Sequence, residues 1–264
     1  MNHLLKFYFK SVGNSVISRL EFKKDLFIGI FGFLIENVSY ILTIFFTISS
    51  IPSFQGWSLY QMGFLYGFTL IPIGIDHLFT DELWRVAYFR VYRGDVDRYF
   101  LRPVPVLFQV IAENLQLEAL GEIIVGVIML CVCGSKSNII WNWQLVVMVF
   151  CAAIFGAFII SGIKIFCCAP SLVFKKSGKL MQIMYNFRDY TRYPIGIYPG
   201  VIKFLLTFVF PFGLMINYPV ETIFFGTYNP LIISAALIVM AIIFMAIGII
   251  FWCICIRKYE SSGS

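Results

Sequence analysis

The sequence predicts an all-α membrane protein with six transmembrane helices, and three observations carry that prediction. Apolar residues fill 60% of the 264 positions, whereas soluble domains contain about 45–50%. Charged residues account for 13%, about half the share found in soluble proteins. The charges gather in a few segments, and several of the apolar stretches between them approach or exceed the roughly 20 residues that a helix needs to cross a bilayer. This composition excludes an ordinary soluble enzyme, a disordered chain and a disulfide scaffold.

The expected spans follow from the apolar stretches, within a single membrane domain of residues 1–264. We place them at about 26–50, 59–79, 105–133, 144–169, 201–217 and 230–256, with boundaries good to ~4 residues. The fifth stretch is interrupted by Pro211, Gly213 and Pro219. We therefore expect a short span there, followed by an outer half-helix that dips back into the membrane.

Basic residues predict the orientation of these spans. Five Lys or Arg precede the first span, five lie in 80–104, seven in 164–203 and two follow the last span, whereas the other sides hold only Lys136. Because cytoplasmic loops are enriched in Lys and Arg, we expect both termini in the cytoplasm. Residues 218–229 are then the one long extracellular segment.

The N-terminal segment predicts a helix that lies on the membrane surface. Apolar residues recur there at three- and four-residue steps, namely Leu5, Phe9, Val12, Val16 and Leu20. A basic amphipathic helix directly before a span is typical of an interfacial helix, which we place at 1–25; the alternative is an irregular, solvated tail. The same basic residues interrupt any signal-peptide core, so we expect the first span to be retained.

The sequence lacks the common catalytic and cofactor motifs. No P-loop, G-x-S-x-G, H-E-x-x-H or G-x-G-x-x-G pattern occurs, and the two histidines lie 74 positions apart. The seven cysteines show no CxxC or zinc spacing and are typical of buried thiols. We expect no metal site and no catalytic site, and any energy from ATP must come from a partner. We expect no nucleic-acid partner despite the net charge of +6, because the basic residues gather on one side of the expected spans.

Acidic and amide residues inside the expected spans are candidates for function, because charged groups in lipid are costly. Glu36 lies in the first span and Asp76 near the inner end of the second. The third span carries six more, listed as Gln109, Glu113, Asn114, Gln116, Glu118 and Glu122. Glu118 and Glu122 share a helix face, and this span contains no basic residue to neutralise them. The stripe predicts a water-accessible cavity wall that attracts cationic or amphipathic substrates; alternatively, the glutamates are protonated and hydrogen-bond between helices, or the inner end of this helix extends below the bilayer.

The loop after the second span, residues 81–104, predicts an amphipathic helix. Its apolar face is formed by Trp84, Ala87, Tyr88, Val91 and Tyr92. Gly94 ends the helix, and Pro103 opens the next span. Such a cytoplasmic helix could lie on lipid headgroups, insert into a groove on a partner protein, or remain a plain surface helix.

Small residues at helical spacing predict close helix packing. Gly63 and Gly67 form a GxxxG pattern in the second span, and Ala153, Ala157 and Ser161 repeat in the fourth. The pattern does not distinguish packing within the chain from packing between chains.

The loop motif resembles one branch of ABC-2 type permeases, the membrane subunits of bacterial ATP-driven exporters. The run from Gly94 to Pro103, G-D-V-D-R-Y-F-L-R-P, is similar to the G-[DE]-x-D-x-[YF]-L-x-R-P signature of that branch. Phe100 departs from the usual Leu. Strong resemblance covers about residues 55–130, and the remainder agrees in layout alone.

The resemblance implies an assembly and a role for particular residues. Such permeases dimerise with themselves or with a sister permease. Each binds one ATPase subunit, and that subunit holds ATP and Mg²⁺. The contact is made by a coupling helix in the loop after the second span. On that basis the ATPase contacts would be Trp84, Arg85, Tyr88, Arg90, Tyr92, Arg93 and Asp97. Relatives in this branch are linked with export of drugs, cationic dyes or peptides, and the substrate pathway would involve Glu36, Glu113, Glu118 and Glu122.

Taken together, the sequence favours the permease subunit of an exporter in a bacterial cytoplasmic membrane. Two other classes stay open. An ion-coupled secondary transporter would use the intramembrane acids as a proton relay, although we find none of the internal repeats common in such folds. A non-transporting scaffold or immunity protein would need no ATPase.

Overall fold

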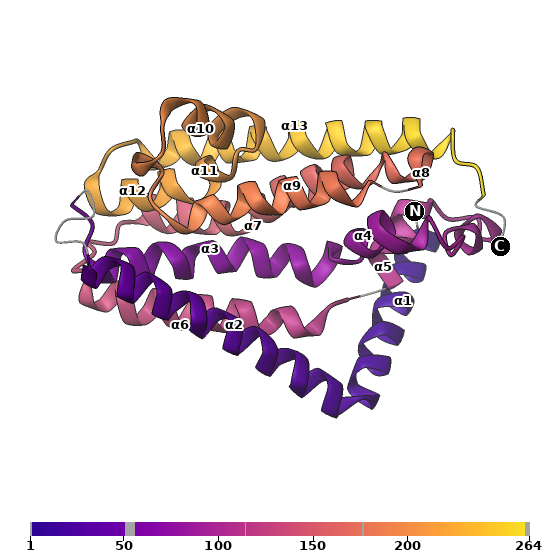
Figure 1. The fold of residues 1–264 in the computed structure, drawn as a ribbon, viewed down its shortest axis with the longest axis horizontal. Helices are drawn as coiled ribbons and strands as arrows, with labels where there is room; N and C mark the ends of the chain where they lie inside the picture. Colours follow the sequence, from indigo (N-terminus) through magenta and orange to yellow (C-terminus); the bar gives the residue numbers. More distant parts are fainter. Residues whose placement is uncertain (1, 51–55, 114, 176, 262–264) are drawn as a thin grey trace.

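The computed structural model describes residues 2–50, 56–113, 115–175 and 177–261, and these form helices joined by turns without any strand. Five helices in these ranges are long and apolar enough to cross a membrane. They lie side by side along the long axis of the molecule, with both chain ends at the same end of the bundle (Figure 1). The structure thus confirms the all-α class and a multi-span architecture.

Four of the expected spans match single helices closely. They are α2 (Lys23–Ser50), α3 (Leu59–Thr80), α7 (Trp143–Cys168) and α13 (Pro230–Ile256). Their starts have recognisable caps: Ser58 and Gln61 form a reciprocal capping box before α3, and Asn142 accepts a backbone hydrogen bond at α7. Asn229 caps α13, where Pro230 occupies the first turn. Of the five candidate spans, α3 is the most buried.

The N-terminal segment is helical, as expected. Helix α1 (Asn2–Glu21) runs across the end of the bundle and then meets α2 at a sharp angle (Figure 1). Its Arg19 and Ser15 reach side chains and backbone near residue 115. The helix is therefore attached to the protein body, which excludes the irregular tail.

The third expected span, 105–133, is not one continuous helix. It is divided into α5 (Val106–Glu113), a 3-10 turn η3 (Leu117–Ala119) and α6 (Leu120–Lys136). The backbone at the break is satisfied from elsewhere, because Leu115 N–H donates to Ser15 Oγ at 3.1 Å and Gln116 N–H donates to the Leu78 carbonyl at 3.1 Å. The prediction of an unbroken polar stripe along this helix is therefore wrong.

The fifth expected span, 201–217, is also absent as a single helix. The chain instead forms a broken path of four helices: α9 (Gly178–Asp189), α10 (Gly200–Phe204), α11 (Phe212–Met215) and α12 (Asn217–Phe225). Gly178 packs on the Tyr88 ring at the end with the chain termini, whereas Phe225 stacks edge-on against Trp57 at the start of α3. This path therefore runs the length of the bundle. The expected outer segment 218–229 is mostly helix α12.

Shorter elements complete the chain. They are α4 (Glu82–Arg85), the π-helix η1 (Val86–Arg90), η2 (Asp97–Leu101), α8 (Ser171–Phe174), η4 (Tyr190–Arg192), η5 (Ile195–Ile197) and the π-helix η6 (Leu205–Val209).

Glycines allow the central helices to touch through their backbones. A Cβ added to Gly67 in α3 would lie 3.0 Å from the Gly126 carbonyl oxygen of α6, so the GxxxG pattern serves packing within the chain. The closest contact joins α7 to α13 at Gly162 and Gly248. A Cβ on Gly162 would lie 2.6–2.7 Å from three backbone atoms of Phe244 and Met245.

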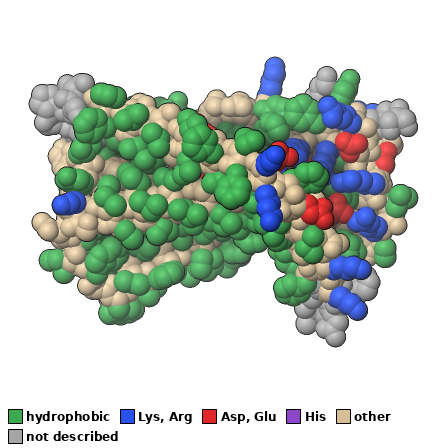
Figure 2. Space-filling model, turned by 90° about the horizontal axis from the view of Figure 1, so that it is seen from below, with side chains coloured by type: hydrophobic (Ala, Val, Ile, Leu, Met, Phe, Trp, Pro, Cys, Tyr) green, Lys and Arg blue, Asp and Glu red, His purple; other side chains and the backbone are tan. Residues whose placement is uncertain are grey.

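The outer surface separates apolar from charged residues. Figure 2 shows apolar side chains along most of the bundle, while Lys, Arg, Asp and Glu gather at the end that carries the chain termini. Large apolar side chains on the outside include Phe27, Phe31, Ile242 and Ile250, all more than half exposed. This distribution fits a surface that lies against lipid.

Substituting Gly162→Ala should destabilise the fold by about 1–3 kcal/mol, because the added methyl group meets backbone that cannot rotate away. Gly32→Ala in α2 is the matched control, since nothing lies within 4 Å of its added Cβ. Thermal unfolding in detergent measures both. Equal melting temperatures for the two variants would contradict the backbone contact.

Candidate functional site in the loop after α3 and among the buried charges

The apolar face of the loop after α3 packs on the protein itself. Leu83, Val86, Ala87 and Val91 are fully buried, and α4 and η1 contact α7, α8 and α9. The face expected to meet lipid or a partner groove is therefore largely used internally. Gly94 ends this helical turn with φ +76°, a left-handed conformation that favours glycine.

Ion pairs and hydrogen bonds fix the shape of this loop. Arg90 pairs with Glu82 at 2.6 Å and donates to the Tyr99 hydroxyl at 2.5 Å. The Gln109 amide donates to the carbonyls of Tyr99 and Val104, which ties the motif to α5. Burial raises the pKa of Glu82 even though Arg90 stands beside it. Arg90 is therefore a structural residue of the loop rather than a free surface group.

Other residues expected to contact an ATPase are divided between the interior and the surface. Trp84 and Tyr88 are half-buried, and the Tyr88 ring lies against Gly178 of α9. Arg85, Tyr92 and Arg93 are exposed. Leu101 of the same loop, which was not among the expected contacts, is 85% exposed.

The motif carboxylate Asp97 binds the C-terminal tail of the chain. Tyr259 and Ser261 donate hydroxyl hydrogen bonds to its two oxygens at 2.7 and 2.5 Å, and the Tyr259 ring stacks on Phe100 with centroids 5.3 Å apart. Hydrogen bonds from Ser261 and then Tyr259 lower the pKa of Asp97. The end of α13 is thus attached to the loop.

The expected substrate-path glutamates do not form one acidic wall. Glu113 pairs with Arg98 and Arg102 at 3.4 and 2.5 Å, and Glu118 pairs with Arg19 of α1 at 2.9 Å. Glu122 faces His77 of α3 at 2.9 Å. Each of these three carboxylates therefore has a basic partner from another element, which the absence of basic residues in the third span did not predict.

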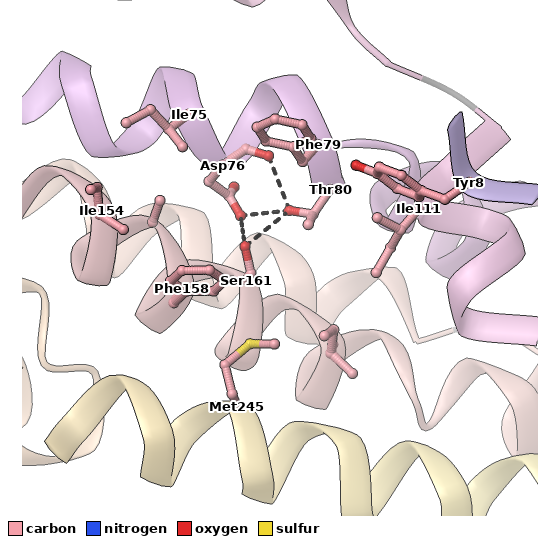
Figure 3. Close-up of a pocket in the computed structure, with 12 residues that line it drawn as sticks. Tyr8, Ile75, Asp76, Phe79, Thr80, Ile111, Ile154, Phe158, Ser161 and Met245 are labelled. Atoms are coloured by element: carbon pink, nitrogen blue, oxygen red, sulfur yellow. Dashed lines mark hydrogen bonds between the residues drawn. The ribbon is translucent and has the colours of Figure 1, made fainter. Parts of the chain in front are cut away.

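An ion pair lies deep between α3 and α7. Lys164 Nζ is 2.5 Å from Asp76 Oδ2 and 3.7 Å from Asp81 Oδ1, and its side chain is fully buried. Thr80 and Ser161 donate to Asp76 Oδ1 at 2.5 and 2.7 Å (Figure 3). Lys164 was assigned to the basic loop 164–203 from the sequence, and this was wrong, because it belongs to α7.

A second charged cluster joins α2, α3, α6 and α9. Arg188 Nη1 lies 2.9 Å from His77 Nε2, while His77 Nδ1 lies 2.9 Å from Glu122 Oε2. Because arginine can only donate, His77 Nε2 accepts, and we assign the imidazole proton to Nδ1, which donates to Glu122. Arg192 stacks over the Tyr40 ring at 3.6 Å. Both arginines were also expected in the basic loop, and here they lie beside α2 and α3.

These groups line a polar cavity of about 120 Å³. Its lining includes Glu36, Tyr66, Glu122, Arg188 and Arg192. Glu36 and Glu122 are the two expected path residues that the structure brings together; Glu113 and Glu118 lie elsewhere. The cavity is therefore large enough and polar enough to hold water.

The family model for ABC-2 family transporter proteins matches residues 34–263. The chain belongs to the ABC-2 transporter family. A comparison with curated proteins found no match. The helical, multi-span fold agrees with this ABC-2 membership.

Sequence reasoning missed the basic half of both charged clusters. Lys164 interrupts an apolar run four residues before its end, and that position alone indicated a helical residue. Arg188 and Arg192 gave a weaker indication of burial, because the sequence of α9 is typical of a polar loop. His77 was set aside as isolated in the sequence, although it lies one residue after Asp76 on a helix with an acidic neighbour in space.

Replacing Lys164 with Met should cost about 3–5 kcal/mol of stability, because Asp76 is then a buried carboxylate without its counter-charge. The double variant Lys164→Met/Asp76→Asn should recover much of that loss. Lys179→Met, at an exposed position in α9, is the control and should be neutral. Denaturation in detergent gives the comparison; a double variant as unstable as the single one would rule out the pair as the cause.

The tail contact should depend on pH. Since the pKa of Asp97 is lowered in the folded protein, the contact is fully present above the ordinary aspartate pKa of about 3.9 and is lost as the pH falls through the lowered value. Amide hydrogen exchange of residues 257–261, corrected for intrinsic rates, should show protection at pH 7 that weakens as the pH falls below the ordinary aspartate pKa of about 3.9. Asp97→Ala should remove the protection at pH 7, whereas Asp95→Ala should keep it. Protection that is insensitive to Asp97 would contradict the contact.

Proposed function

We propose that the chain is the permease subunit of an ATP-driven exporter in a bacterial cytoplasmic membrane, working with a separate ATPase and with a second permease. The observation that carries the proposal is the folded loop 81–104 of an ABC-2 transporter, which presents exposed side chains at the end of the bundle that bears both chain ends. In this proposal both termini are cytoplasmic. The broken path from α9 to α12 then provides the sixth crossing.

The surface of the loop supports ATPase docking by a subset of the expected residues. Arg85 and Arg93 offer positive charge, and Tyr92 and Leu101 offer exposed apolar area, 56% and 85% respectively. A central apolar contact bordered by arginine is the composition that protein interfaces favour. Trp84, Tyr88, Arg90 and Asp97 would act indirectly by holding the loop on α9, on Glu82 and on the C-terminal tail.

The proposed cargo is a drug, a cationic or amphipathic compound, or a peptide. The four glutamates remain our candidates for its path, with one change from the sequence-based hypothesis. A cationic group would have to exchange with a basic side chain already bound at Glu113, Glu118 or Glu122. Glu36, exposed on α2 and facing the polar cavity, would be the first carboxylate that such a group meets.

One observation favours a second candidate, an ion-coupled transporter. His77 lies against Glu122 in a buried contact, and proton relays in membrane proteins are built from such histidine and carboxylate side chains. Vanadate inhibits transport powered by an ATPase, whereas a protonophore inhibits proton-coupled transport. Measured on the same vesicles, the two inhibitors separate the candidates.

Charge reversal on the exposed loop surface should release the ATPase. Arg85→Glu/Arg93→Glu should lower copurification of an ABC ATPase from native membranes at least about tenfold, which corresponds to about 1.4 kcal/mol. Lys136→Glu, exposed at the opposite end of α6, is the matched control and should leave copurification unchanged. The measurement is quantitative mass spectrometry after mild-detergent extraction.

The same experiment can reject the proposal. Purification of the unchanged protein without any ABC ATPase, in an active form, would favour the ion-coupled or scaffold alternative. Equal recovery of ATPase with both charge variants would move the docking surface away from Arg85 and Arg93. A second permease recovered in equal amount would identify a heterodimer.

A further inference from the structure

An apolar groove runs between α5, α7 and α13, apart from the polar cavity. Two adjoining cavities of about 430 and 520 Å³ form it. Both are lined by Ile111 of α5, Ile165 of α7 and Met245 of α13, so they meet at these three residues. Figure 3 shows the inner part, where Ile154, Phe158 and Met245 stand around the Asp76 cluster.

The part of the groove nearest the chain termini has the length of one bilayer leaflet. The cavity of about 430 Å³ follows α7 from Ile154 to Ile165, and the cavity of about 520 Å³ follows α13 from Met245 to Ile256. Because Gly162 of α7 lies against Gly248 of α13, these two stretches are staggered. The larger cavity alone covers about 16 Å of helix, close to half of the roughly 30 Å hydrocarbon core, and both cavities together cover about 27 Å. We call the end of the groove at Asp76 its inner end. Its outer end is the one beside Phe100 and Arg102, where the charged end of the protein begins.

The width of the groove suits a hydrocarbon chain rather than a helix. The two volumes spread over about 27 Å leave a cross-section of roughly 35 Å², whereas a helix 10 Å across needs roughly 80 Å². The polar groups at the inner end are already engaged, because Asp76, Thr80 and Ser161 bond to one another and Asp76 pairs with Lys164. The remaining lining is almost wholly aliphatic and aromatic.

The outer end of the groove is basic. Arg102 lines it and is about half exposed although it pairs with Glu113. Arg257 and Lys258 are exposed and lie between Ile256, which lines the groove, and Tyr259, which stacks on the groove residue Phe100. The acids nearby are Glu113 and Asp97, which both have partners, and the exposed Glu260. Arg98 also pairs with Glu113, so four basic side chains accompany three carboxylates, and this excess of positive charge favours an anionic head.

We propose that this groove binds an acyl chain of an anionic phospholipid from the leaflet on the side of the chain termini, with the phosphate at Arg102, Arg257 and Lys258. Apolar burial holds the chain, and the basic residues select the head group. The bound lipid would fill the space between α5 and the α7–α13 pair. This inference concerns a resident lipid and does not depend on the identity of the exported cargo.

Native mass spectrometry of the full chain tests the groove. The protein is released from nanodiscs of equal phosphatidylglycerol and phosphatidylcholine, and we expect one phosphatidylglycerol retained per chain. Ile111→Trp and Met245→Trp, which fill the shared section, should lower its occupancy at least fivefold. Ile242→Trp is the matched control, since Ile242 lies on the exposed face of α13 and should keep the lipid. Arg257→Gln/Lys258→Gln should retain a lipid but lose the preference for phosphatidylglycerol.

A second measurement tests the groove in the unchanged protein. Trp252 lines the groove and is almost fully buried, so phosphatidylglycerol with brominated acyl chains should quench its fluorescence more than brominated phosphatidylcholine at equal content. The fluorescence of Trp252 is obtained by subtracting the fluorescence of Trp252→Phe from that of the unchanged protein. Equal quenching by both lipids, or equal lipid retention by the groove variants and Ile242→Trp, overturns the proposal. Displacement of the lipid signal by a second copy of the chain or by an amphipathic cation also overturns it.

Discussion

The buried pair of Asp76 and Lys164 constrains the rest of the bundle. Removing two charges from water costs several kcal/mol per ion, and only close geometry with extra hydrogen bonds compensates for that cost. Thr80 and Ser161 supply those bonds from the same two helices. Neither α3 nor α7 can therefore rotate without exposing a charge to apolar surroundings. The next residue, His77, extends this requirement to α6 and α9. One turn of the most buried helix thus fixes the orientation of three neighbours.

The acids at the end of the bundle follow the same rule on a smaller scale. Glu82 binds Arg90 within the loop after α3, whereas Glu113 and Glu118 each bind an arginine from another element. The pairs attach α1, the loop after α3 and the break between α5 and α6 to one another. Exposed ion pairs stabilise little by themselves, but the low exposure of Glu82 and Glu118 makes the loss of either partner costly. The loop therefore moves only together with the elements that neutralise it.

The sequence predicts those features whose cause is local. Continuous apolar runs with capping residues identify α2, α3, α7 and α13 to within a few residues. No proline or glycine marks the break before α6 in the sequence. The backbone N–H groups at the break are instead bonded to Ser15 and Leu78, which are distant in the chain. The glutamates were singled out from the sequence as costly in lipid, yet the basic partners of Glu113, Glu118 and Glu122 lie 11 to 99 positions away. Pairing at such separations follows from tertiary structure alone.

The charges of α9 have a consequence for how the chain enters the membrane during synthesis. Arginine inside a helix opposes insertion by the translocon at about 2.5–3.5 kcal/mol per residue, so a segment with Arg188 and the adjacent Arg192 is a poor insertion signal by itself. The groups that receive them, His77, Glu122 and Tyr40, belong to helices made earlier. In the proposed six-span arrangement, insertion of α9 to α12 is thus a tertiary folding step that follows assembly of α2, α3 and α6. A substitution in α3 can then impair biogenesis of a segment made more than a hundred residues later.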